Sequence, residues 1–198
     1  MTIERPRDHP NELQVGAMRV ACSILRPATW LGGALSLLIR GFTIGKGGRY
    51  SHLFMRLGDD VWEANELGVV AGLLAAYADP AYVCDMYYVP VDLGMQNRIA
   101  GWLDRRVGTG YSLLNNLAAA MDALALLNFI PSPLVSLVEF LAARDPRYNC
   151  SELVASAYAC EGYALLPDVP PWRFVPDDIH AAWKLGRCLY RGRLSFEE

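Results

Sequence analysis

Four short hydrophobic stretches, each bounded by polar or turn-forming residues, predict β-strands. They cover residues 14–25, 50–57, 61–70 and 82–91, and a closing edge strand is expected within 187–194. Gly58-Asp59-Asp60 separates the second stretch from the third and has the composition of a hairpin turn. These two stretches are therefore expected to pair as a β-hairpin.

Apolar residues at helical spacing predict helices in five further segments. These segments cover residues 30–40, 97–107, 112–143, 150–161 and 177–185. Pro131 and Pro133 interrupt the longest segment, so it is expected to form two helices arranged as a hairpin. Gly162 and Gly186 follow the last two segments, at the position where glycine commonly ends a helix.

The chain of 198 residues suits one α+β domain better than two independent folds. We expect a flexible arm over residues 1–13 and a single domain over 14–198, in which the helical hairpin at about 112–143 is an insertion. The 18 basic and 21 acidic residues give a net charge of −3, so we expect no nucleic-acid partner. The sequence does not indicate an oligomeric state.

Two observations bear on location. The first twelve residues are polar and lack the apolar core of a secretory signal. The longest apolar stretches, 28–39 and 117–130, are shorter than the roughly 20 residues that cross a bilayer. We therefore expect a cytoplasmic protein. Membrane contact is not expected, although the apolar stretch 117–141 is compatible with it, as the sequence is with export by a route that needs no signal peptide.

The cysteine pattern suggests neither a disulfide framework nor a metal site, because the count is odd and the spacings are irregular. The five cysteines stand at positions 22, 84, 150, 160 and 188. One reactive thiol and four cysteines packed as small hydrophobic residues is the expected arrangement. The glycine-rich segment 41–48 departs from the phosphate-loop pattern, so a nucleotide is not expected. We expect no metal and no cofactor.

Cys150 has the strongest chemical context in the chain. Asn149 is a good helix N-cap, and Glu152 follows three positions later, as in a capping box. Cys150 is then the first helical residue, where free backbone N–H groups and the helix dipole favour the thiolate. The same N–H groups are suited to bind an oxyanion. The alternative is a buried structural cysteine at a helix start.

His52 is the best candidate for the base among three histidines. It lies within an apolar strand, whereas His9 is in the charged N-terminal arm and His180 is in the middle of a short helix. Glu63, on the partner strand, is the candidate that orients the imidazole, and Asn65 is the runner-up. A two-residue turn places both on the same sheet face as His52, whereas a three-residue loop places them on the opposite face.

Four segments resemble, in order, those of the circularly permuted papain-like hydrolases of the NlpC type, whose relatives include lecithin:retinol acyltransferase. They are Tyr50-Ser51-His52-Leu53-Phe54, Trp62-Glu63-Ala64, Gly108-Thr109-Gly110-Tyr111-Ser112 and Asn149-Cys150-Ser151-Glu152-Leu153-Val154. A weaker fifth match is Phe174-Val175-Pro176-Asp177-Asp178-Ile179. The chain departs from the family at its start, where a strand with a Gly-Asp-Ile-like pattern is common.

This resemblance implies an antiparallel sheet packed against helices, with the histidine strand before the cysteine helix. It implies that Cys150 attacks a carbonyl, that His52 is the general base and that Glu63 orients His52. Residues near these three, namely Tyr50, Tyr111 and Ser151, are expected to contact the substrate. Tyr111 could equally be a packing residue.

The bond that is cut is expected to be an amide, in a peptide or cell-wall peptide. A lipid acyltransferase or thioesterase that uses the same Cys–His pair is the alternative, motivated by the apolar helical hairpin. The partner is accordingly a peptide-like or acyl-bearing substrate. A third hypothesis is a binding module that keeps the fold but has an unreactive Cys150.

Overall fold

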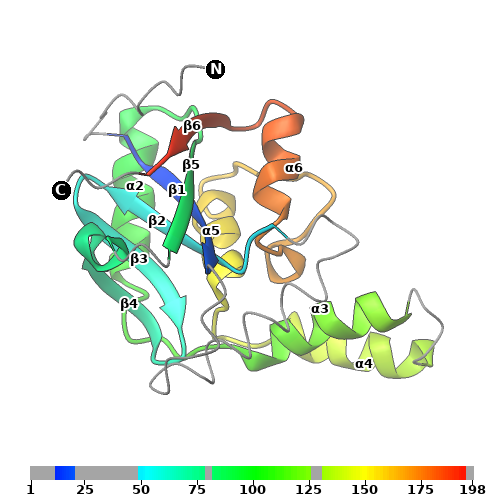
Figure 1. Cartoon of the computed structure of the whole chain (residues 1–198). Coiled ribbons are helices and arrows are strands. Elements are labelled where there is room, and N and C mark those ends of the chain that lie inside the picture. The colour runs from blue at the N-terminus through cyan, green and yellow to red at the C-terminus, as the bar shows by residue number, and fades with distance from the viewer. Residues whose placement is uncertain (1–11, 21–48, 79–81, 126–130, 195–198) are drawn as a thin grey trace.

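Six strands form one antiparallel sheet in the order β4-β3-β2-β1-β5-β6 (Figure 1). The computed structural model describes residues 12–20, 49–78, 82–125 and 131–194. The strands are β1 (Gln14–Val20), β2 (His52–Leu57), β3 (Asp60–Asn65), β4 (Gly68–Leu73), β5 (Tyr82–Tyr88) and β6 (Leu189–Arg193). The first strand of the β2–β3 hairpin therefore lies beside the N-terminal strand β1, and β6 closes one edge as expected.

The helices are α2 (Leu93–Asp104), α3 (Leu113–Ala125), α4 (Ser132–Ala142), α5 (Cys150–Ala159) and α6 (Asp178–Lys184). Two short 3₁₀ helices, η3 (Leu74–Tyr77) and η4 (Pro171–Arg173), complete the described elements. Gly162 and Gly186 have positive φ angles of 76° and 71° just after α5 and α6, as expected of glycines that end helices. In the part of the chain that is described, no helix has both the length and the apolarity to cross a membrane.

The two faces of the sheet carry different hydrophobic cores. On one face, Val15, Leu53 and Met55 pack with residues of α2, α5 and α6, which form the main core. On the opposite face, Phe54 and Tyr77 belong to a smaller cluster that η3 helps to build. In Figure 1, α2, α5 and α6 accordingly surround one side of the sheet. The strand residues alternate between the two cores, as a strand buried on both sides requires.

The β2–β3 hairpin has the register that the catalytic hypothesis needs. Leu57 pairs with Asp60, so Gly58 and Asp59 alone form the turn. Phe54 pairs with Glu63. His52 lies two positions before Phe54, which makes His52 and Glu63 diagonal neighbours on one face of the sheet.

Glycine is required where two segments approach closely. A Cβ on Gly16 would lie 2.0 Å from the Phe54 ring, so this glycine gives the ring its place across β1. A Cβ on Gly68 would lie 2.4 Å from the carbonyl oxygen of Thr109, and Gly68 also has a φ of +107°. This close approach lets the backbone of Val69 exchange hydrogen bonds with Thr109 and Gly108, which hold the 108–112 segment against β4.

The structure corrects several boundaries. The stretch 61–70 is not one strand but parts of β3 and β4, which turn back at Glu66 and Leu67. Leu13, expected at the end of a flexible arm, is fully buried, and its N–H donates to Gln96 at 2.7 Å. Residues 1–11 of that arm lie outside the described residues. Cys160, expected in the core, is exposed just past the end of α5. The helix expected over 30–40, the glycine-rich segment 41–48 and Cys22 lie outside the described residues.

Candidate active site

The N-terminus of α5 holds Cys150 at the first helical position. The side chain of Asn149 accepts a hydrogen bond from the N–H of Glu152 at 2.7 Å, and Asn149 has an extended conformation. The N–H of Asn149 in turn binds the Glu152 carboxylate. The predicted capping box is therefore confirmed, and it fixes the start of the helix at the cysteine.

Cys150 and His52 form a coupled pair inside the protein. Cys150 is 2 % exposed, and the side chain of His52 is 14 % exposed. Burial raises the pKa of Cys150, but the charge of His52 and the hydrogen bond to it outweigh burial and lower the pKa. Burial likewise lowers the pKa of His52, but Cys150 and Glu63 together raise it. The pair therefore favours thiolate and imidazolium over two neutral groups.

Two backbone N–H groups stabilise the sulfur of Cys150. The N–H of Ser151 binds Sγ from within the first turn of α5. The N–H of Leu53 binds it from β2. The pairing of β2 with β3 ends at Phe54 and Glu63. Leu53 lies one residue beyond this last pair, so its N–H binds the sulfur of Cys150 rather than a carbonyl of β3.

Glu63 makes the contact with His52 that was predicted for a third residue. Its Oε2 lies 2.6 Å from Nε2 of His52. This leaves Nδ1 as the ring nitrogen for the thiol of Cys150. Asn65 does not replace Glu63 but supports it, because its side-chain amide donates to Oε1 of Glu63 at 3.1 Å. Burial raises the pKa of Glu63, but the hydrogen bonds from His52, Tyr77 and Asn65 lower it to about 2.

Tyr77 is a site residue that sequence reasoning missed. Its hydroxyl donates to Oε2 of Glu63 at 2.6 Å, the same oxygen that faces His52. Its ring stacks on Phe54 with centroids 4.3 Å apart. Tyr77 ends a single-turn helix between two strands, and the chain contains ten tyrosines, so no local signal distinguished this one.

The segment 108–112 brings Tyr111 beside the cysteine. Tyr111 pairs with Tyr148 in a short parallel bridge, and the N–H of Ser112 donates to the carbonyl of Tyr148 at 3.0 Å. Burial raises the pKa of Tyr111, and so does its proximity to the charge of Cys150. Asn116 donates to the Tyr111 hydroxyl at 2.9 Å and fixes its direction. Tyr111 thus lies near Cys150, and its contact with substrate stays a prediction.

Ser151 has an internal role in the structure. It is 2 % exposed, and its hydroxyl donates to the carbonyl of Phe174 at 2.6 Å. This bond ties α5 to the proline-rich segment that leads to α6. The expected contact of the Ser151 side chain with substrate stays a prediction, and its backbone N–H is the part that reaches Cys150.

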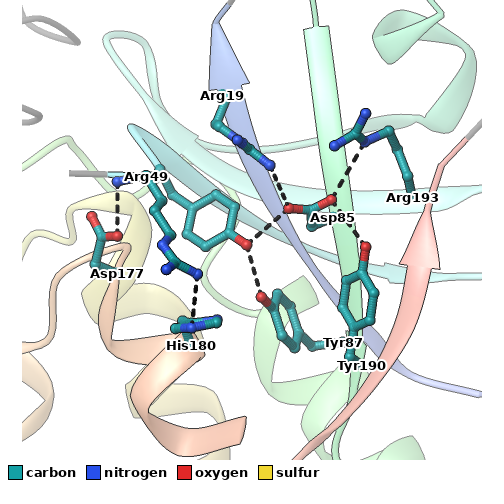
Figure 2. A network of polar contacts seen from close by, with 9 residues as sticks. Arg19, Arg49, Asp85, Tyr87, Asp177, His180, Tyr190 and Arg193 are labelled. Carbon is teal, nitrogen blue, oxygen red and sulfur yellow. Dashed lines mark hydrogen bonds and ion pairs between the residues drawn. The ribbon is translucent and has the colours of Figure 1, made fainter. Parts of the chain in front are cut away.

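Tyr50 belongs to a second polar network, centred on Asp85 of β5. Its buried hydroxyl donates to Asp85 at 2.9 Å and lies 2.8 Å from the hydroxyl of Tyr87. Figure 2 shows Asp85 between Arg19 and Arg193, at 2.9 and 3.6 Å. The contact of Tyr50 with substrate also stays a prediction, since its polar atom is engaged in this network.

His180 takes part in a separate contact, on α6. One of its ring nitrogens lies 2.8 Å from the guanidinium of Arg49, as Figure 2 shows. The backbone N–H of Arg49 donates to Asp177 at 2.9 Å. His180 is thus engaged through Nε2, whereas its Nδ1 is buried without a hydrogen-bond partner among the described residues. His9 lies outside the described residues.

Comparisons of the chain with protein-family models, with curated proteins and with solved structures found no match. Among the residues that the structure describes, no group of histidine, cysteine and acidic side chains is arranged to hold a metal ion. The functional argument therefore rests on the geometry of Cys150, His52 and Glu63.

Proposed function

We propose that the protein is a cysteine hydrolase that cuts an amide bond by way of a thioester on Cys150. One observation carries this proposal: His52 lies between Cys150 and Glu63, so that one ring nitrogen contacts the carboxylate and the other serves the thiol. A structural cysteine at a helix start needs neither a partly buried histidine nor a partly buried carboxylate behind that histidine. A nucleophile needs both, because the base must be oriented and its charge stabilised.

In the first step, the Cys150 thiolate attacks the carbonyl carbon of the substrate, and the carbonyl oxygen becomes an oxyanion. The backbone N–H of Cys150 is at the first helical position, where helix geometry supplies no acceptor, and it is suited to bind this oxygen. The intermediate collapses, the C–N bond breaks, and the proton on Nδ1 of His52 passes to the leaving amine.

In the second step, neutral His52 removes a proton from water, and the resulting hydroxide attacks the thioester carbon. The C–S bond breaks, the carboxylic acid leaves, and the thiolate–imidazolium pair is restored. Glu63 remains ionised throughout, since its pKa is far below neutrality. The sum of the two steps is one amide and one water converted to one acid and one amine.

The proposed relationship is to the circularly permuted papain-like hydrolases. It is supported by the chain order, in which the strand of His52 and the strand of Glu63 precede the helix of Cys150. The orienting carboxylate on the strand after the histidine strand, and the Tyr111 turn near the nucleophile, agree with it. We propose an amide in a peptide-like substrate on the same basis.

Acylation by a small activated ester tests the proposal. Because Cys150 is 2 % exposed, the probe should be no larger than p-nitrophenyl acetate. We expect a rapid burst of nitrophenolate and an acetyl group on the peptide that contains Cys150, detected by mass spectrometry. The adduct should disappear in Cys150→Ala and form at least tenfold more slowly in His52→Ala.

Cys160 provides the matched control, because it is an exposed thiol at the C-terminal end of the same helix. Cys160→Ala should leave the burst unchanged. Acetylation of Cys160 with an unmodified Cys150 would contradict the proposal and favour a binding module. Turnover of acyl-peptide anilides but not of phospholipid esters would distinguish the amide hydrolase from the lipid acyltransferase.

A further inference from the structure

The α3–α4 hairpin has three distinct sides. Between the helices, a small hydrophobic cluster is buried that includes Ala118 and Met121 of α3 and Val135, Val138 and Ala142 of α4. Figure 1 shows the two helices side by side, projecting beyond the sheet. The hairpin therefore has its own core and is not simply a cover for the sheet.

One side of the hairpin is fixed to the body by polar contacts. The side-chain amide of Asn115 on α3 donates to the buried carboxylate of Glu152 on α5. Glu139 on α4 forms an ion pair with Arg173 of η4 at 3.1 Å. These contacts define the side of each helix that faces the protein.

The opposite side carries leucines. Residues three and four apart share one face of a helix, so Leu113 and Leu117 form a stripe on α3. Leu134, Leu137 and Leu141 form a stripe on α4 for the same reason. At about 100° per residue, both stripes lie on the side of the hairpin away from Asn115 and Glu139. The five side chains are 45–63 % exposed. We call them the leucine face.

We propose that the leucine face pairs with the leucine face of a second copy of this chain, so that two hairpins form a four-helix arrangement. The spacing of three and then four residues on α4 is that of a helix seam that packs against other helices. None of the five positions is charged, so two identical faces meet without repulsion. Such a self-complementary contact closes with twofold symmetry, the commonest form of soluble oligomer.

The area agrees with a dimer. Five half-exposed leucines offer roughly 500 Å² of apolar surface, so two such faces in contact bury about 1,000 Å² before their neighbours are counted. This reaches the roughly 1,000 Å² at which specific interfaces begin, and each face lies in the upper part of the range of about 300–600 Å² for the largest apolar patch of a monomer, a size that is often functional. The inference does not depend on activity at Cys150.

Sedimentation equilibrium of the full chain tests this pairing. The single chain has a mass of 21.9 kDa, and we expect twice this mass at micromolar concentration, with dissociation on dilution. Leu137→Glu, in the middle of the α4 stripe, should weaken the dimer at least a hundredfold. Leu137→Ser should weaken it less. Unchanged circular dichroism at 222 nm would show that both variants remain folded.

Leu93→Glu is the matched control. Leu93 is 61 % exposed at the first position of α2, where an acidic residue suits the helix dipole, and it is not on the hairpin. This variant should remain a dimer. A monomeric wild-type protein, or a dimer insensitive to both changes at Leu137, would overturn the inference. Wild-type monomers that float with phosphatidylcholine–phosphatidylglycerol vesicles in a Leu137-dependent way would assign the face to a bilayer instead.

Discussion

The Nε2 atom of His52 lies 2.6 Å from Oε2 of Glu63, across the two strands of one hairpin. The contact fixes the imidazole so that its other nitrogen serves the thiol of Cys150. It also places a negative charge against the ring, which is one of the reasons that the pKa of His52 is raised. The geometry therefore supplies both orientation and charge, the two properties that a catalytic base requires.

Replacing Glu63 with glutamine should destabilise the protein in a pH-dependent way. The pKa of Glu63 is lowered from 4.5 to about 2, so its ionic contribution is complete above about pH 4.5 and lost as the pH falls toward 2. The pKa of His52 is raised from 6.5 to about 10, so its contribution is complete below about pH 6.5 and lost as the pH rises toward 10.

The free energy of unfolding of Glu63→Gln should consequently differ most from that of the wild type between about pH 4.5 and 6.5. Urea unfolding from pH 3 to 9 measures this difference. Glu66→Gln, in the exposed β3–β4 turn, is the control and should show a small, flat difference. A difference for Glu63→Gln that does not vary with pH would contradict the ion pair.

Replacing Tyr77 with phenylalanine isolates the hydroxyl that binds Glu63. The ring can keep its stack on Phe54, whereas Oε2 of Glu63 loses one of its donors. We expect a loss of about 2 kcal/mol in unfolding free energy, the value of a hydrogen bond to a charged group. Alkylation of Cys150 at pH 6 should slow several-fold, because the carboxylate that supports His52 is less stabilised.

Tyr82→Phe is the comparison for this variant. The Tyr82 ring lies 6.1 Å from that of Tyr77 but takes no part in the contacts of Glu63. Cys150 in the Tyr82→Phe variant should be alkylated at the wild-type rate. If both tyrosine variants behave alike, Tyr77 has only a packing role.

Replacing Asn149 with alanine should affect both stability and reactivity. The variant loses the cap of α5, which is worth about 1 kcal/mol, and the start of the helix at Cys150 is no longer fixed. Asp92→Ala removes the equivalent cap of α2, where Asp92 accepts from Met95 at 2.8 Å. Unfolding experiments should show similar losses for both variants.

Only Asn149→Ala should slow the alkylation of Cys150, because only that cap adjoins the thiol. Alkylation followed by peptide mass spectrometry measures this directly. Equal alkylation rates in the two variants would show that the helix start does not activate the cysteine.

Much of the site could be predicted because local chemistry determines it. The capping box around Cys150 is a pattern of two side chains three positions apart, so the sequence alone indicates where α5 starts. The hairpin turn was recognisable, but its length was not, because Gly58, Asp59 and Asp60 all suit a turn. Only the pairing of Leu57 with Asp60 decided on which face Glu63 lies.

The remaining parts depend on which elements meet in space. Tyr77 reaches Glu63 because η3 packs against one face of the sheet, and no periodicity in the sequence specifies this position. The N–H of Leu53 reaches Cys150 because a strand ladder ends early, which is a tertiary property. Cys160 was wrongly expected in the core. Its apolar neighbours in the sequence do not reveal that α5 ends at Ala159 and leaves the following cysteine exposed.

The pH dependence of Cys150 alkylation by iodoacetamide, measured beside His52→Ala, tests the central claim most directly. Cys160 serves as the reference thiol in the same spectra, because it is exposed and its pKa is raised by burial and by Glu161. We predict rapid labelling of Cys150 below pH 7 that slows at least tenfold without His52. Labelling of Cys150 that follows an ordinary thiol titration near pH 8.5 in both proteins would contradict the activated pair.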